Sequence, residues 1–182
     1  MPIPALSNTL ITAPLRIIVA PVIRSTQVQR NMLRGLVLYS AGDTVAALLL
    51  NDFHWLRLLG VALLGGFLYA FEVPAFFNWI DRIVPESKSQ ASRWLRAALS
   101  QVYFNPIWIL RHMVFLLVFT GQFEQIGWHL LPVAAKSFAL NAPVSLVVNY
   151  FIQNHVSPQR RFLASSVYSG VMAVYYALSA TW

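Results

Sequence analysis

The sequence predicts an all-α integral membrane protein, a bundle of four to five transmembrane helices with short amphipathic helices at the membrane surface. Three observations support this fold class: 58% of the 182 residues are hydrophobic, only 10% are charged, and the apolar residues fall into five long blocks. A soluble domain carries about 25% charged residues. The 13 basic and 6 acidic side chains cannot keep so apolar a chain in water, so most of its surface faces lipid or a partner.

Residues 1–30 are predicted to form an N-terminal interfacial segment, followed by a single transmembrane bundle domain over 31–182. The segment contains Arg16, Arg24 and Arg30, five Ser or Thr residues and no acid. This composition is typical of an amphipathic segment that targets a protein to an organelle. We expect a helix that lies in the membrane interface.

The five apolar blocks are long enough to be embedded helices. About 20 residues are needed to cross the hydrocarbon core, and the blocks span residues 32–50, 58–80, 102–120, 126–152 and 162–182. The last block carries no charge and is the clearest candidate. The fourth contains Lys136, Pro132 and Pro143 and is the most doubtful.

The basic residues between the blocks predict how often the chain crosses. From the N-terminus onward, the six segments before, between and after the blocks contain 4, 1, 4, 0, 2 and 0 Lys and Arg residues, with Arg34 at the start of the first block counted in the first segment. Such alternation is expected for five crossings with the N-terminus on the positive side. If the fourth block did not cross, Arg160 and Arg161 would fall on the side opposite the other basic segments, which favours five crossings. Four crossings are the alternative. The stretch from Pro85 to Arg96 is predicted to be a short helix on the membrane surface.

Small residues at helical spacing predict close packing of the bundle. Helices in lipid approach each other where Gly, Ala or Ser replaces a larger side chain. The blocks show Gly42 with Ala46, Gly66 with Ala70, and a last stripe of Ser165, Ser169, Ala173 and Ala177 beside Ser166 and Gly170.

Four charged residues inside the blocks require partners: Asp43, Glu72, Arg111 and Lys136. A charge in the middle of a bilayer costs a few kcal/mol, so each should face protein or water. Two acids and two bases permit two internal pairs. These residues could line a polar path for a small solute, or form buried salt bridges that fix the helix register, and the sequence leaves both open.

Enzymatic and cofactor chemistry finds no support in the sequence. The chain has no cysteine, which excludes disulfides and thiolate metal sites. Only His112 of the four histidines is central to a block, so two axial haem ligands at one depth are missing. No phosphate loop or hydrolase motif is present. We expect no enzyme, cofactor or metal, and no nucleic-acid partner, because the arginines lie between apolar blocks.

A series of short motifs follows in order along the chain. Gly42-Asp43 comes first, then Asp81-Arg82 with Pro85, then Gln101 and Pro106, then Pro143 and Asn149, and residues 176–179 come last. This series resembles the 22-kilodalton peroxisomal membrane protein family, the Mpv-seventeen type. Its Gly-Asp motif, its Leu-Asp-Arg-x-x-Pro motif, the spacing of a later motif and its closing Trp-x-x-Tyr-Leu-Ser are similar to these residues.

The chain also departs from that family as a divergent member. Ala47, Ser100, Ala142 and Leu146 replace polar or aromatic motif residues, Ala70-Phe71-Glu72 replaces a Gly-Pro, and Phe76-Phe77 replaces Trp-Tyr. A water-filled path tolerates such replacements poorly. The resemblance therefore implies the fold more strongly than a channel activity.

The resemblance implies a non-enzymatic protein of an organelle membrane, which we expect to be the inner mitochondrial membrane, with the peroxisomal membrane as the alternative. The favoured hypothesis is an accessory subunit of a larger membrane complex that binds lipid. Its head-group ligands would be Arg34, Arg93, Arg96, Arg160 and Arg161, and cardiolipin is the expected lipid. The alternative is a weakly selective channel for small solutes or ions, lined by Asp43, Glu72, Arg111 and Asn149.

Overall fold

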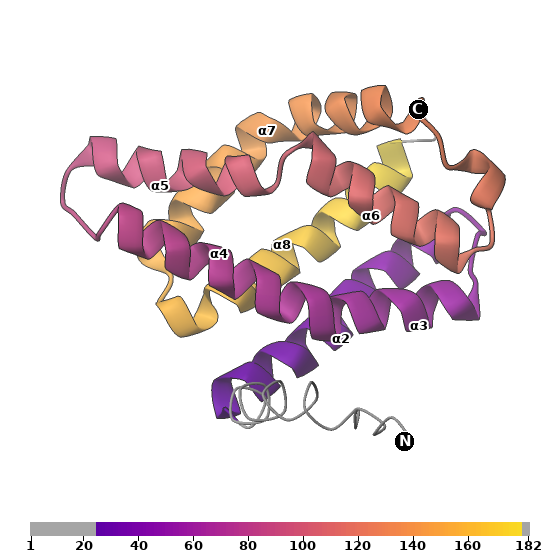
Figure 1. The fold of residues 1–182 in the computed structure, drawn as a ribbon, viewed down its shortest axis with the longest axis horizontal. Coiled ribbons are helices and arrows are strands. Elements are labelled where there is room, and N and C mark those ends of the chain that lie inside the picture. Colours follow the sequence, from indigo (N-terminus) through magenta and orange to yellow (C-terminus); the bar gives the residue numbers. More distant parts are fainter. Residues whose placement is uncertain (1–24, 180–182) are drawn as a thin grey trace, which may run out of the picture.

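The structure, a computed structural model, describes residues 25–179, with side chains up to residue 174. It confirms the predicted all-helical fold (Figure 1). Residues 1–24 of the predicted interfacial segment lie outside the described residues. The first described helix, α2 (Thr26–Leu49), begins inside the range assigned to that segment.

The second block forms one helical rod from Trp55 to Ile83, in three pieces. These are α3 (Trp55–Leu63), the π-helical turn η1 (Leu64–Tyr69) and α4 (Ala70–Ile83). Pro74 lacks an N–H and cannot donate to the carbonyl of the residue four positions earlier. The widened π turn lies directly before α4, where the missing N–H of Pro74 interrupts the regular ladder of backbone hydrogen bonds.

The third block is longer than predicted because its helix begins within the polar stretch. Helix α5 (Gln90–Tyr103) is followed by α6 (Pro106–Phe119) after a short break. Asn105 caps α6 by accepting hydrogen bonds from the backbone N–H groups of Ile107 and Trp108 at 2.8 and 3.1 Å, and Pro106 occupies the first turn, where its missing N–H is not needed.

The surface helix predicted from Pro85 to Arg96 is therefore not a separate element. Its second half is the first part of α5, which packs against α7 (Leu130–His155). The chain then continues from α7 into α8 (Pro158–Ser179). The short 3-10 turn η2 (Phe123–Gln125) lies in the loop before α7.

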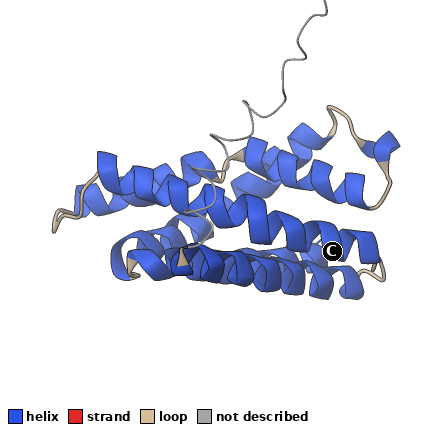
Figure 2. Ribbon diagram, turned by 60° about the horizontal axis from the view of Figure 1, so that its bottom comes forward, coloured by secondary structure: helices blue, strands red, loops and turns tan. Residues whose placement is uncertain are grey.

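The helices form two groups. Helix α2 contacts α3, η1, α4 and α8, whereas α7 contacts α5 and α6 (Figures 1 and 2). Contacts of α3 with α6, α4 with α5, and α7 with α8 join the groups. The described core contains Tyr39, Val61, Tyr69, Val73, Phe77 and Ile80.

Helices α2 and α8 run side by side in the same direction. Near their N-termini Gln27 Nε2 donates to the carbonyl of Gln159 at 2.8 Å. Further along, a Cβ added at Gly42 would lie 2.5 Å from the Cα of Gly170. The predicted small-residue packing of the first and last blocks is thus confirmed at this pair.

Glycine also permits the contact of α2 with the π turn. A Cβ at Gly35 would lie 2.0 Å from the carbonyl oxygen of Gly65, and one at Gly65 would lie 2.3 Å from that of Gly35. No side chain fits between these backbones. Helix α2 is consequently held on one side by η1 and on another by α8.

Within the described residues four helical stretches are long and apolar enough to cross a membrane: 26–49, 55–83, 90–119 and 130–155. The fourth block, the doubtful one in the sequence, is among them. Helix α8, which contains most of the block predicted to be the clearest candidate, is 22 residues long but does not belong to this set of four. The expectation of five crossings is therefore supported for the first four blocks only. The protein is a multi-span membrane protein by helix length and hydropathy.

Candidate functional site

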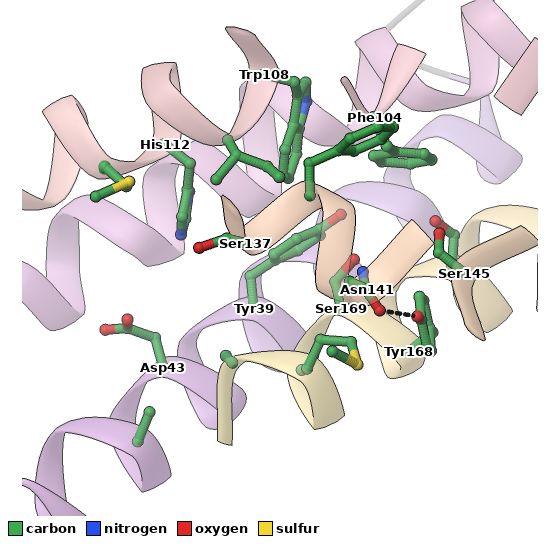
Figure 3. A pocket seen from close by; sticks show the side chains of 18 of the residues that line it. Tyr39, Asp43, Phe104, Trp108, His112, Ser137, Asn141, Ser145, Tyr168 and Ser169 are labelled. Carbon is green, nitrogen blue, oxygen red and sulfur yellow. Dashed lines mark hydrogen bonds between the residues drawn. The ribbon is translucent and has the colours of Figure 1, made fainter. Parts of the chain in front are cut away.

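A cavity of about 360 Å³ lies between the two groups of helices and receives side chains from α2, α6, α7 and α8 (Figure 3). Along α2 its wall runs from Tyr39 to Leu50, which is about 16 Å at 1.5 Å per residue. Cavities of about 300–1,000 Å³ hold small organic ligands. The cavity is therefore long and follows the helix axes.

Uncharged polar groups line one wall of the cavity. Gln101 donates from Nε2 to the carbonyl of Ala142 at 2.8 Å, and its Oε1 accepts from the Ser145 hydroxyl at 3.3 Å. Asn149 Nδ2 donates to Ser145 Oγ at 3.2 Å. The hydroxyl of Tyr168 on α8 donates to Oδ1 of Asn141 on α7 at 2.7 Å (Figure 3). These bonds join α5 to α7 and α7 to α8.

A charged pair stands at the other end of the cavity. Arg57 on α3 donates from Nε and Nη2 to the two carboxylate oxygens of Asp43 on α2, both at 2.9 Å. Its Nη1 also donates to Asp52 at 3.1 Å. The side chains of Arg57 and Asp43 are 11% and 8% exposed, so this bidentate pair is buried.

This pair corrects the prediction that Asp43 is matched by a base inside the blocks. Its partner Arg57 falls between the predicted blocks 32–50 and 58–80, but the second helical rod begins at Trp55 and includes it. Lys136 is exposed on α7 and makes no ion pair within the described part of the chain. Arg57 is two residues into α3 and therefore lies beside the end of α2. That position is the sequence feature that could have indicated its pairing with Asp43.

Glu72 and Arg111 do pair, as one of the two expected internal pairs. Arg111 Nη1 and Nη2 donate to the two Glu72 oxygens at 2.9 and 2.8 Å and so join α6 to α4. The Arg111 guanidinium lies 5.9 Å from the ring centroid of Tyr69. The pair does not line the cavity, so of the four residues predicted to line a path only Asp43 and Asn149 do so.

His112 connects this pair to the cavity wall. The Tyr69 hydroxyl is 2.9 Å from its Nδ1, and the Trp108 indole stacks on its ring at 5.9 Å between centroids. Trp108, His112 and Tyr39 line the cavity together (Figure 3). The sequence alone indicates only one possible role for His112, as a haem ligand. The described residues hold no cluster of three or more metal-ligating side chains.

A second ionic cluster closes the opposite end of the bundle. Asp81 at the end of α4 accepts from Arg161 Nη1 at 2.7 and 2.8 Å, and from Arg96 Nη2. Arg96 also donates to the carbonyls of Val84 and Gln153. One carboxylate thus joins α4, α5 and α8, and Arg96 adds α7.

This cluster corrects the prediction that Arg96 and Arg161 present their guanidiniums to lipid head groups from exposed loops. Their side chains are 1% and 2% exposed, so neither guanidinium lies on the outer surface of the bundle. Arg34 donates to the carbonyl of Gln159 at 3.2 Å, and Arg93 Nε lies 3.4 Å from the carbonyl of Ser87. Arg160 is exposed.

The remaining motif residues have structural positions. Gly42 packs on Gly170, Pro106 begins α6, and Pro143 lies inside α7. Gln101 and Asn149 are on the cavity wall. Their neighbours Asn141 and Tyr168 were missed, because helical spacing alone does not show which residues of α7 and α8 face each other.

Comparisons with protein families, with curated proteins and with solved structures find no match to this chain.

Proposed function

We propose that this protein is a non-enzymatic membrane protein that lets a small uncharged solute enter and pass its helical bundle. The observation that carries the proposal is the cavity with its row of hydrogen-bonding side chains in an otherwise apolar bundle. Hydroxyl and amide groups are the features that distinguish one solute from another in such a path. A channel in an organelle membrane is the alternative that the resemblance to the 22-kilodalton peroxisomal membrane protein family implies, and the neutral lining of the cavity is what favours it here.

The charges of the cavity favour an uncharged solute. Apart from Asp43 and Arg57, its polar wall consists of neutral groups, Gln101, Asn141 and Asn149 among them. Asp43 and Arg57 bind each other with two hydrogen bonds, so their charges are compensated. An ion that entered would lose its hydration without an opposite charge to replace it. A polyol or a similar neutral solute meets amide and hydroxyl partners instead.

Flux into vesicles tests this proposal. Purified protein reconstituted in liposomes should accelerate osmotic swelling in glycerol over that of protein-free vesicles. Ser169→Phe should return the rate to the protein-free level, because Ser169 lines the cavity and a phenyl ring would fill it. Val171→Phe is the matched control, since Val171 lies on the same helix with 60% of its surface exposed. Equal swelling with and without protein, or equal loss in both variants, would refute the proposal.

An accessory role in a larger membrane complex is the second candidate. It is supported by the loop between α6 and α7, where Phe123, Ile126 and Trp128 are exposed, Trp128 to 89%. These residues lie in none of the four membrane-spanning stretches, so a partner subunit could cover them. The inner mitochondrial membrane is the proposed location and the peroxisomal membrane the alternative.

Native gel electrophoresis in mild detergent, with mass spectrometry of the band, tests the accessory role. Co-migration of the endogenous protein with a large complex would support it, and replacing Phe123 and Trp128 by Ser should then release the protein. Migration alone or as a small homo-oligomer would contradict it.

A further inference from the structure

A second cavity, of about 230 Å³, lies between the first turns of α2, the second half of α4 and the start of α8. Its polar lining consists of Gln27, Asn31, Asn78, Gln159 and Arg161. A cavity needs only about 10–15 Å³ of such volume to hold one water molecule, so this one has room for a larger polar group. It belongs neither to the first cavity nor to the proposed solute path.

The lining is rich in hydrogen-bond donors and lacks a carboxylate. Four side-chain amides and one guanidinium surround the space, and Asn31 is 5% exposed. The Arg161 side chain is 2% exposed. Its Nη1 donates to Asp81 and its Nε to the carbonyl of Val156, while its Nη2 lies 3.6 Å from Glu86. Gln27 Nε2 already donates to Asn31 and to the carbonyl of Gln159. A ligand here would therefore meet the buried guanidinium of Arg161 and the side-chain N–H groups of the other three amides, donors from which phosphate oxygens accept.

The electrostatic surroundings also favour an anion. Helix α8 begins at Pro158 and is 22 residues long, so the positive end of its dipole lies at the cavity. Arg34 donates to the carbonyl of Gln159 on the same rim. The loops and helix ends on this side of the bundle carry Arg30, Arg34, Arg82, Lys88, Arg93, Arg96, Arg160 and Arg161 against only Asp81 and Glu86 among the described residues.

The apolar part of the lining suggests where the phosphate comes from. Phe77 and Phe162 lie on the same cavity as the amides, with Pro74 one turn deeper on α4. Gln27 and Asn31 are in the first two turns of the first membrane-spanning helix, which is the depth of a lipid head group. We propose that this cavity binds a phosphate group, presented by an anionic phospholipid whose glycerol and first acyl carbons contact the two phenylalanines.

Gln159→Glu is the sharpest variant. It places a carboxylate in the cavity at the second position of α8, where a negative charge stabilises the helix, so the protein should fold. Gln90→Glu is the matched control, because Gln90 is also exposed at the start of a helix on the same side of the bundle. Its carboxylate can still accept from the Tyr150 hydroxyl, as Oε1 does at 3.0 Å.

Native mass spectrometry with added lipid measures the binding. The unmodified protein should retain phosphatidylglycerol in preference to phosphatidylcholine. Gln159→Glu should weaken the retention about tenfold or more, the loss expected for a hydrogen bond to a charged group replaced by repulsion. Asn31→Leu should weaken it as well, and Gln90→Glu should not. A rise in melting temperature with inorganic phosphate alone, absent in Gln159→Glu, would support the anion site with free phosphate as its source.

Equal phosphatidylglycerol retention in the unmodified protein, Gln159→Glu and Asn31→Leu, with no effect of inorganic phosphate, would overturn the proposal. Retention that falls equally in Gln90→Glu would also overturn it, because general attraction to the basic surface would then explain the binding. Glycerol flux through the first cavity should be unchanged in Gln159→Glu. This separates failure of the phosphate site from failure of the proposed solute path.

Discussion

The two ends of the bundle are built from the same two residue types in opposite ratios. At the end that contains Asp81, which we call the basic end, one carboxylate holds two buried arginines. At the end that contains Arg57, which we call the Arg57 end, one arginine holds the two carboxylates Asp43 and Asp52. The first cluster joins four helices, and the second joins only α2 and the start of α3.

This difference explains where the cavity lies. The basic end is closed because Asp81 and Arg96 connect α4, α5, α7 and α8. At the Arg57 end α6 and α7 have no ionic link to α2 among the described residues, and the cavity occupies the space between them. The excess of bases on one side also agrees with an orientation set by positive charge. Helix pairing and charge asymmetry therefore come from the same few residues.

The largest expected effect concerns the sides of the membrane on which the two ends lie. The chain has no cysteine, so a single introduced thiol reports its own position. Cysteine at Ser87 or Ser157 of the basic end should react with an impermeant reagent from one side, and cysteine at Asn51 from the other. Labelling of Ser157→Cys and Ser87→Cys from opposite sides would contradict the five-crossing arrangement.

Asp81→Asn should have the next largest effect. It leaves the guanidinium of Arg96 buried without a charge partner and leaves Arg161 with Glu86 alone, and breaking a buried pair costs about 3–5 kcal/mol. The fall in stability can be measured by unfolding in mixed detergent micelles. Glu86→Gln is the control, because Glu86 is 75% exposed and 3.6 Å from Arg161. Equal stability of both variants would show that the cluster does not hold the basic end together.

Asp43→Asn should destabilise less than Asp81→Asn. Arg57 loses a buried bidentate partner but keeps Asp52, so we expect about 1–3 kcal/mol from a hydrogen-bonded charge. Asp52→Asn should cost no more than about 1 kcal/mol, because Asp52 is 42% exposed and solvent or head groups screen it. The same unfolding experiment applies. A larger loss for Asp52→Asn than for Asp43→Asn would reverse the assignment of the buried partner.

More of the fold than of the site could be predicted from the sequence, and particular residues show why. Block length and charge alternation predicted the helices, because both depend on residues close together in sequence. The rarity of charges inside apolar blocks predicted internal acid–base pairs but not which residues pair, and of the four only Glu72 and Arg111 meet. Asp81 and Arg161 are 80 residues apart, and no local pattern indicates that the ends of α4 and α8 meet.

Arg96 shows most clearly what the local sequence cannot predict. A basic residue in a polar stretch beside an apolar block is typical of a membrane surface, and the prediction placed it there. The structure buries it because Asp81 and Val84 at the end of α4, and Gln153 on α7, supply acceptors. Burial of an arginine depends on those partners and not on its neighbours in sequence.

The parallel packing of α2 on α8 has a consequence for biosynthesis. Helices α2 and α8 form the glycine contact Gly42–Gly170, and Gln27 bonds to a carbonyl 132 residues away. Until α8 has been synthesised, α2 has no partner for that face. This contact can thus close only after the intervening helices have been made, and a chain stopped before or within α8 would present an unfinished seam to quality-control proteases.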